Sequence, residues 1–304
     1  MKKFEELKSQ NREIEVKLSD EMLEVNEKIK LKKIMYQNKL EMLDLIHEEE
    51  KQRFGITAGE LIEKVNNMPT YPKYATGIYD FDNAIGGGFE TGLFVNLAGE
   101  SGSGKTTLLL KILSNMAQSR KVVFFNFEMG IRLLAKKLKA LNLSQEQLNN
   151  LITDSDSTDI DDLIMEIELY SAEGIKFFCI DSKMKITSKK QGQEYQIISY
   201  ISNLLSKLCA KKDITIFLIN QTSEEDLKNK RLSFKGSGDQ KYDTDIALFL
   251  VKEEEQRKLI CNKNRMNDKL FAIDITENKP IITEYQTIGR NNIVPDNDFL
   301  SNIA

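Results

Sequence analysis

The stretch GESGSGKT, residues 99–106, constrains the fold more than any other part of this sequence. Its spacing, a glycine, four residues, a glycine, a lysine and a hydroxyl side chain, is that of a phosphate-binding loop. An apolar run, GLFVNLA, precedes it, and the helical pattern TTLLLKILSNMAQ follows it. This context predicts a strand–loop–helix unit that cradles a nucleotide.

Each residue of the loop has an expected task. The glycines let backbone N–H groups crowd around phosphates, and the helix dipole helps to hold the anion. Lys105 is expected to reach the β- and γ-phosphates of ATP, and Thr106 to ligate Mg²⁺. The expected nucleotide-binding residues are Gly99, Gly102, Gly104, Lys105, Thr106 and Thr107.

From Gly77 onward, short apolar runs alternate with amphipathic helical stretches. Continuous apolar runs suit strands buried on both faces. Their alternation with helices predicts the α/β class, with a mostly parallel sheet and right-handed crossovers. The last runs follow one another closely, which suggests an antiparallel edge. The expected strands are 92–98, 122–127, 175–180, 214–220, 245–251, 257–262 and 270–275.

The N-terminal part has a different character, because residues 1–54 contain neither glycine nor proline and are rich in good helix formers. An apolar stripe at helical spacing predicts a long helix or a hairpin turning near SQN (9–11) or YQN (36–38). A solvated, partly frayed helix is the alternative. The expected regions are an N-terminal helical region or coiled coil (1–54), a linker helix capped by Thr57 and Glu60 with a connector (55–76), a nucleotide-binding domain (77–290) and a polar tail (291–304).

The net charge, the cysteines and the hydropathy of the chain restrict what it can bind and where it can reside. The net charge is −4 and the isoelectric point about 5.5, so binding of nucleic acid would depend on local basic segments. Three widely spaced cysteines indicate reduced, buried thiols and no zinc site. With no apolar run near ~18 residues and no apolar core of a signal peptide, we expect a cytoplasmic protein without a membrane partner.

Three polar residues follow buried strands and could complete a nucleotide site. Asp181 ends one apolar run and is placed to hold Mg²⁺ through water, although a strand-end aspartate can also cap the next helix. Glu128 could act as a general base on a water in line with the γ-phosphate, or be a surface residue. Gln221 could sense the γ-phosphate and relay its loss to the following loop.

Two lysine-rich loops follow expected strands and could line a channel for single-stranded nucleic acid, although such loops are often only solvated surface. Lys183 and Lys185 belong to the first loop, and Lys228, Arg231 and Lys235 to the second. Neither loop has interleaved aromatic residues, so backbone contacts with DNA are the better hypothesis.

A basic pair, Lys263 and Arg265, lies at the end of another apolar run. Residues at alternate positions of an extended chain point the same way. In a ring, the pair could reach the nucleotide of the next subunit as an arginine finger, and the alternative is ordinary surface residues.

With these elements in this order, residues 76–276 resemble the RecA-like P-loop ATPases, most closely the motor domain of the DnaB-type replicative helicases. TGIYDFDNAIGGG, FNFEM, KGSGDQKYDTDIALFL and NKNRMN are similar to motifs of that family. The resemblance implies that Lys235, Ser237 and Gly238 touch DNA phosphates. It also implies that Lys263 and Arg265 are the finger pair.

The resemblance implies a DNA helicase that hydrolyses ATP with Mg²⁺ at the subunit interfaces of a homo-oligomer, expected to be a hexameric ring on single-stranded DNA. The segment 1–54 is too short for that family's primase-binding domain, so a helical collar and a primase or loader partner stay open. IDS, INQT and NKNRM look more like RadA or KaiC ATPases. A recombination ATPase and a nucleotide-gated assembly protein are therefore the alternatives.

Overall fold

The computed structural model describes residues 2–20, 23–50, 57–67, 72–223, 231–236, 240–253, 256–277 and 285–287. The chain divides into two compact units: residues 1–70 with 168–173, and residues 71–167 with 174–304. Among the helices within these ranges, none has both the length and the apolar character required to cross a bilayer.

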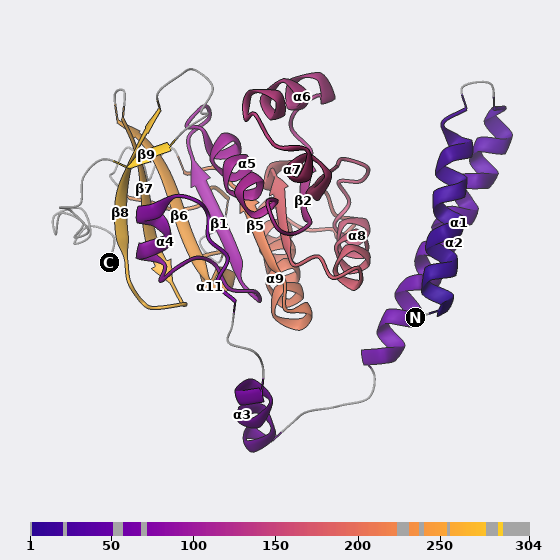
Figure 1. Cartoon of the computed structure of the whole chain (residues 1–304), viewed down its shortest axis with the longest axis horizontal. Helices are drawn as coiled ribbons and strands as arrows, with labels where there is room; N and C mark the ends of the chain where they lie inside the picture. The colour runs from indigo at the N-terminus through magenta and orange to yellow at the C-terminus, as the bar shows by residue number, and fades with distance from the viewer. Residues whose placement is uncertain are drawn as a thin grey trace. The chain divides into compact units, whose positions relative to one another are not determined.

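The first unit contains a helical hairpin (Figure 1). Its helices, which pack against each other, are α1 (Lys2–Leu18) and α2 (Val25–Glu50). Between them the Asn38 amide donates a hydrogen bond of 3.0 Å to the Asn11 side-chain oxygen. Both asparagines are buried, and a buried polar pair of this kind fixes the register of two helices.

The position of the turn differs from the expectation. We expected it near residues 9–11 or 36–38, but α1 ends at Leu18 and α2 begins at Val25. The asparagines that suggested a turn are the two that pair inside the hairpin. The hairpin that the sequence predicts is present, but both segments expected to form its turn lie inside helices.

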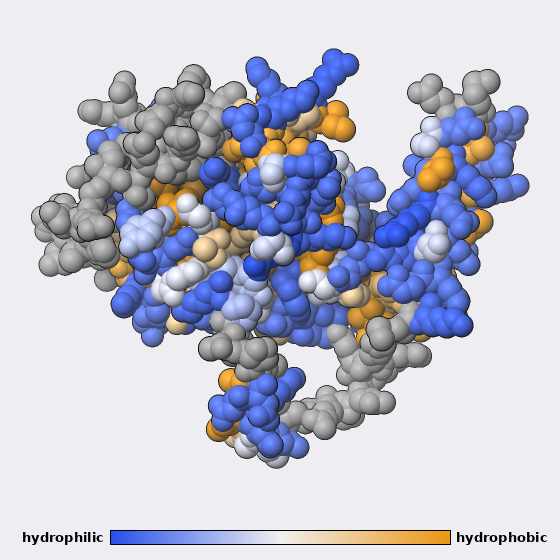
Figure 2. Space-filling model, viewed as in Figure 1, coloured by the Kyte–Doolittle hydropathy of each residue, from blue (hydrophilic) through white to orange (hydrophobic). Residues whose placement is uncertain are grey.

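The short helix α3 (Ala58–Asn67) begins where the sequence predicts. The Thr57 hydroxyl accepts a bond from the Glu60 N–H, and the Glu60 carboxylate accepts one from the Thr57 N–H. This reciprocal capping box closes the helix start. No residue of α3 is buried, and Ile62 is 61% exposed, so apolar atoms lie on its surface (Figure 2).

The second unit is built on a sheet whose described strands follow the order β3-β2-β4-β5-β1-β6-β7-β8-β9 (Figure 1). Pairing is parallel from β3 through β6 and antiparallel from β6 to β9, which confirms the mostly parallel α/β fold and the antiparallel edge. The strands are β1 (Phe94–Gly99), β2 (Val122–Asn126), β3 (Leu151–Asp154), β4 (Phe177–Asp181), β5 (Thr215–Ile219), β6 (Ile246–Glu253), β7 (Gln256–Asn264), β8 (Phe271–Glu277) and β9 (Tyr285–Thr287).

Every residue of β1, β2, β4 and β5 is buried, as the continuous apolar runs predict. The sequence reading missed β3, which has only four residues and is partly exposed, and the three-residue strand β9. Both are short strands in the outer part of the sheet.

Helices join the parallel strands and cover the sheet. The step from β1 to β2 and the step from β4 to β5 run in opposite directions along the sheet, so right-handed crossovers place their helices, α5 and α9, on opposite faces. The described helices that follow residue 78 are α4 (Tyr79–Ala84), α5 (Lys105–Met116), α6 (Ile131–Ala140), α7 (Gln145–Asn150), α8 (Ile160–Ala172), η1 (Lys183–Lys185), α9 (Glu194–Lys212) and α11 (Gln240–Asp243).

Candidate nucleotide-binding site

The phosphate loop joins β1 to α5 as the sequence predicts, because the strand ends at Gly99 and the helix begins at Lys105. Gly104 has a φ of 101°, a left-handed conformation that favours glycine. A Cβ on Gly99 would lie 2.5 Å from the Leu250 carbonyl oxygen, so a larger residue would displace β6. The loop thus presents the first backbone N–H groups of α5, which have no partner within the helix, to an anion.

The Lys105 ammonium is held at this loop. Its Nζ donates to the carbonyl oxygens of Gly99, at 2.9 Å, and Glu100, at 2.7 Å. Burial lowers the pKa of Lys105, and the nearby Asp181 carboxylate acts in the opposite direction. A phosphate entering the loop would meet this cation.

Thr106 and Asp181 lie together at the carboxyl ends of the strands. The Thr106 hydroxyl donates a 2.7 Å bond to Oδ2 of Asp181, the last residue of β4. The other carboxylate oxygen, Oδ1, is buried without a hydrogen-bond partner in the described part of the chain. Burial raises the pKa of Asp181 to about 6, and the Glu128 carboxylate adds to this, against the Thr106 hydrogen bond and the Lys105 charge. A hydroxyl and a carboxylate with a bare oxygen are hard donors, so this pair fits Mg²⁺.

A cavity of about 270 Å³ opens beside the loop. It brings together seven residues expected at the site, which come from three separate segments of the sequence: Gly102, Gly104, Lys105, Thr106, Thr107, Glu128 and Gln221. The other lining residues are Ser101, Lys137, Ser182, Ile219, Asn220 and Arg257.

Two cations in this cavity were missed by the sequence reading. Lys137 on α6 donates to the Thr107 hydroxyl at 3.4 Å, and Nε of Arg257 on β7 donates to the Ser103 carbonyl oxygen at 2.7 Å. Both add positive charge to a cavity that already has the geometry for phosphates. No motif distinguishes them, because Lys137 is one of several lysines on a helix and Arg257 lies in the antiparallel part of the sheet.

Gln221 connects the cavity to the basic loop that follows it. The Lys235 backbone N–H donates to the Gln221 carbonyl oxygen at 2.8 Å, and the Lys235 ammonium lies 3.4 Å from Gln221 Oε1. A side chain that lines the nucleotide cavity is therefore in direct contact with a residue expected to bind DNA.

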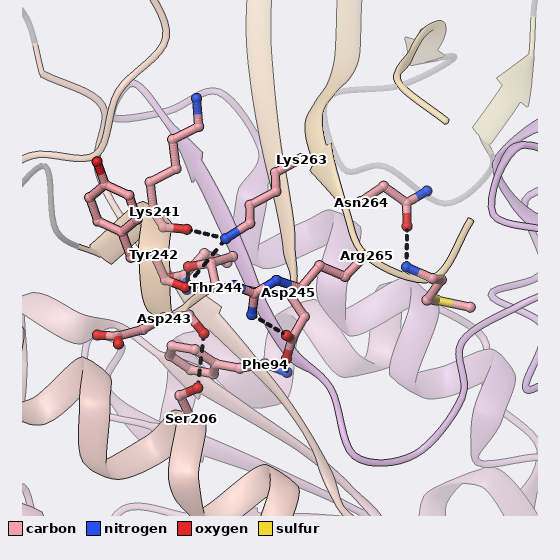
Figure 3. Close-up of polar contacts among 12 residues, drawn as sticks. Phe94, Ser206, Lys241, Tyr242, Asp243, Thr244, Asp245, Lys263, Asn264 and Arg265 are labelled. Carbon is pink, nitrogen blue, oxygen red and sulfur yellow. Dashed lines mark hydrogen bonds and ion pairs between the residues drawn. The ribbon is translucent and has the colours of Figure 1, made fainter. Parts of the chain in front are cut away.

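Lys263 and Arg265 lie outside the residues that line the nucleotide cavity, and they point to the same side, as their spacing predicts (Figure 3). The Lys263 ammonium donates to the carbonyl oxygens of Lys241 and Tyr242. The Arg265 guanidinium donates to the Tyr242 carbonyl oxygen at 3.1 Å and pairs with Asp245 at 2.9 Å. About half of the Arg265 side chain is exposed, at 53%.

Among the residues expected to bind DNA, Lys185, Arg231 and Lys235 are exposed. Three further expected residues, Lys228, Ser237 and Gly238, lie outside the described residues.

Lys183 requires a correction. Its side chain is buried, and its ammonium donates to Gln240 Oε1 at 2.8 Å and to the Lys235 carbonyl oxygen at 3.2 Å. Burial lowers the pKa of Lys183 to about 7, although the Glu194 carboxylate opposes the shift. We therefore assign Lys183 to the support of the Lys235 loop instead of to contact with DNA.

The three cysteines, Cys179, Cys209 and Cys261, are free and buried, as expected. Within the residues that the structure describes, no group of histidine, cysteine and acidic side chains is arranged to hold a metal ion by itself.

One family model matches the part of the chain that contains the phosphate loop. Residues 81–226 match the family described as AAA domain. The DNA repair protein RadA of Aquifex aeolicus (strain VF5) is 27% identical over 188 residues, which cover 60% of this chain and 41% of the relative. RadA of Escherichia coli (strain K12) is 33% identical over 85 residues, 28% of this chain and 18% of the relative. The chain spans less than half the length of these curated relatives.

Solved structures share the fold. A DnaB-like replicative helicase, solved with its interactions with primase, has a TM-score of 0.67 at 16% identity over 92% of this chain and 75% of its own. A KaiC-like protein from Pyrococcus horikoshii OT3 has a TM-score of 0.58 at 19% identity over 72% of this chain and 100% of its own. At these identities the likeness establishes the fold.

Proposed function

We propose that this chain, whose second unit has the fold of RecA-like P-loop ATPases, hydrolyses ATP to move along single-stranded DNA as a DnaB-like helicase. The observation that carries the proposal is Gln221, which lines the nucleotide cavity and contacts Lys235. Loss of the γ-phosphate beside Gln221 would change the position of a basic residue on the exposed loop. That coupling is what a translocating ATPase requires.

Residues of one chain would bind ATP. Lys105 and the backbone N–H groups of the loop hold the phosphates, with Lys137 and Arg257 as further cations at the cavity. Thr106 and Asp181 would hold Mg²⁺, which supplies neutralisation of phosphate charge when it is bound.

Glu128 is the candidate general base. It lines the cavity together with Lys105 and Thr106, and its charge contributes to the raised pKa of Asp181, so the two carboxylates lie close together. From this position it would orient a water and accept its proton as the water attacks the γ-phosphate.

A second copy of the chain would complete the site. Lys263 and Arg265 do not line the cavity of their own chain, and the Arg265 side chain is half exposed. An arginine supplied by a neighbour stabilises the charge of the transition state and contributes roughly 10³-fold or more to turnover. We propose a ring, expected to be hexameric, in which this pair reaches the adjacent nucleotide.

The N-terminal helices would support assembly. The exposed apolar side chains of α3, Leu61 and Ile62, would pack against a neighbouring subunit, because a helix without any buried residue needs a partner for its apolar face. The α1–α2 hairpin would form a collar and offer a surface to a primase or a loader.

A second candidate function, a recombination ATPase, is equally supported, because the curated relatives are named DNA repair protein RadA. A nucleotide-gated assembly protein is the third. Both alternatives would use the same nucleotide site as the helicase. They differ from the helicase in the process that ATP hydrolysis would drive.

A forked DNA duplex with one labelled strand separates these functions. Hydrolysis of ATP is measured with and without single-stranded DNA, with Lys105→Ala as the inactive control. Stimulation with release of the labelled strand supports the helicase. Stimulation without release supports the recombination ATPase, and the absence of any stimulation supports the assembly protein and refutes the proposal.

A further inference from the structure

A second cavity, of about 640 Å³, lies between the first half of α9 and the short helix α11. Tyr195 and Tyr200 line it from α9, Tyr242 lines it from α11, and Lys190 lines it from the loop before α9. We name it the tyrosine cavity after its three tyrosines. Among the described residues, none lines both this cavity and the nucleotide cavity.

Two of the three rings of the tyrosine cavity are exposed and therefore available to a ligand. Tyr195 is 49% exposed and Tyr242 is 76% exposed. The Lys190 ammonium lies 4.1 Å from the centroid of the Tyr200 ring, which puts a cation within the cavity. The exposed Lys241 is next to Tyr242, and Figure 3 shows both side chains extending from α11.

The cavity is held by contacts of the backbone of α11. The Tyr242 carbonyl oxygen accepts bonds from Lys263, at 3.3 Å, and Arg265, at 3.1 Å. The Ser206 hydroxyl of α9 donates to the Asp243 carbonyl oxygen at 2.9 Å. These bonds hold α9 and α11, the helices that carry the tyrosines, in place. The rings are therefore positioned before a ligand binds.

The lining indicates which ligand fits. The residues described around this cavity are aromatic and polar, and they include no aliphatic side chain. They offer aromatic faces, the Lys190 ammonium, the Asp243 carboxylate and the side-chain amides of Gln196 and Asn203. Unpaired nucleobases stack on such rings, amides can bond to base edges, and ammonium groups attract the connecting phosphates.

The position of the Lys235 loop supports the same ligand. A Cβ on Gly236 would lie 2.6 Å from Cδ1 of Ile198, so this loop packs against α9 in the segment that carries Tyr195 and Tyr200. A nucleic-acid strand whose phosphates contact Lys235 would therefore have its bases near α9. We infer that the tyrosine cavity binds the unpaired bases of single-stranded nucleic acid by stacking. This inference rests on the proposed function for its ligand and adds a base-binding subsite to it.

The test uses the full chain with Mg²⁺ and a non-hydrolysable ATP analogue, and measures fluorescence anisotropy of two labelled oligonucleotides, oligo(dT) and an abasic strand of equal length. The variants are Tyr195→Ala/Tyr242→Ala, the corresponding double Phe variant, and Tyr79→Ala. Tyr79 is a matched control, because it is 69% exposed and lines neither cavity.

We expect the double Ala variant to bind oligo(dT) about 5- to 150-fold more weakly for each base that loses its ring, which corresponds to ~1–3 kcal/mol per stacked base. Its binding of the abasic strand should be unchanged. The double Phe variant and Tyr79→Ala should bind both strands as the wild type does. Since the mutated rings are exposed, the variants should unfold at the wild-type denaturant concentration.

Three results would overturn the inference. The first is that the double Ala variant binds oligo(dT) with wild-type affinity. If DNA still stimulates ATP hydrolysis, this result leaves the proposed function intact. Another is a raised KM for ATP with unchanged oligonucleotide binding, which assigns the rings to adenine. The third is a wild-type protein that binds neither strand, which removes the proposed function as well.

Discussion

Replacing Gln240 by alanine should destabilise the second unit by about 2–4.5 kcal/mol. The Gln240 side chain is almost completely buried, and its Oε1 accepts hydrogen bonds of 2.8 Å from both the Lys183 ammonium and the Asn220 amide. Losing a bond to a charged group costs ~1.5–3 kcal/mol and losing a neutral one ~0.5–1.5 kcal/mol. The Lys183 ammonium would keep only its weaker 3.2 Å bond to the Lys235 carbonyl oxygen among the bonds described for it above.

Guanidinium unfolding of the full chain, followed by circular dichroism, measures this change in the free energy of unfolding. Gln145→Ala is the matched control, because Gln145 is an exposed glutamine whose side chain bonds only within α7 as described, and its loss should stay within ~0.5 kcal/mol. The same reasoning predicts weaker oligonucleotide binding by Gln240→Ala, since Gln240 Nε2 also donates to the Lys235 carbonyl oxygen at 3.3 Å. A Gln240→Ala protein as stable as the control would refute the assigned network.

Three further measurements test the site, and a fourth tests the dependence of stability on pH. Lys105→Ala should abolish ATP binding in a fluorescent-nucleotide titration, since it removes the ammonium at the phosphate loop. Asp181→Asn should lose Mg²⁺-dependent hydrolysis yet unfold at an equal or higher denaturant concentration at pH 7, because burial raises the pKa of Asp181 to about 6 and its ionised form is costly in the fold. Arg265→Ala should reduce turnover by roughly 10³-fold with ATP affinity unchanged, and full activity would count against a shared site. Burial raises the pKa of Cys261 from 9.0 to about 12, so above pH 9 the folded protein keeps a proton that the unfolded chain releases. The free energy of unfolding should therefore fall as the pH rises above about 9. Cys261→Ala should make that fall smaller in unfolding curves measured at a series of pH values.

The grouping of the candidate nucleotide-site residues could be predicted from the sequence because its signals are local. The phosphate loop has fixed spacing, and Glu128, Asp181 and Gln221 each follow an apolar run that becomes a buried strand. Parallel strands bring their carboxyl ends to one edge, so residues far apart in the chain meet there without any further information. The cavity beside Lys105 contains two of these residues as predicted, and the third, Asp181, bonds to Thr106.

The burial of Lys183, the position of the hairpin turn and the tyrosine cavity could not be predicted from the sequence, because each depends on how separate helices and loops pack together. Lys183 was expected at the surface because lysines usually are, but the Gln240 amide and the Lys235 carbonyl oxygen let its ammonium remain inside. The hairpin turn was misplaced because Asn11 and Asn38 resemble turn residues, and their pairing across the two helices becomes visible only when the helices are packed. The tyrosine cavity likewise needs α11 to lie against α9.

A network of buried polar side chains around Gln240 lies between the nucleotide cavity and the tyrosine cavity. Asn220 lines the nucleotide cavity and donates to Gln240, and Gln240 begins the same short helix, α11, on which Tyr242 stands. The Thr244 hydroxyl extends the network by donating to the Gln240 carbonyl oxygen at 2.7 Å and accepting from Asn96 of β1 at 2.8 Å. In a buried polar network, a group that moves alone leaves its partner unpaired, which is costly. A change at the γ-phosphate would therefore reach the tyrosine rings through Asn220 as well as the basic loop through Gln221, so bases and phosphates of one strand would be released or gripped together.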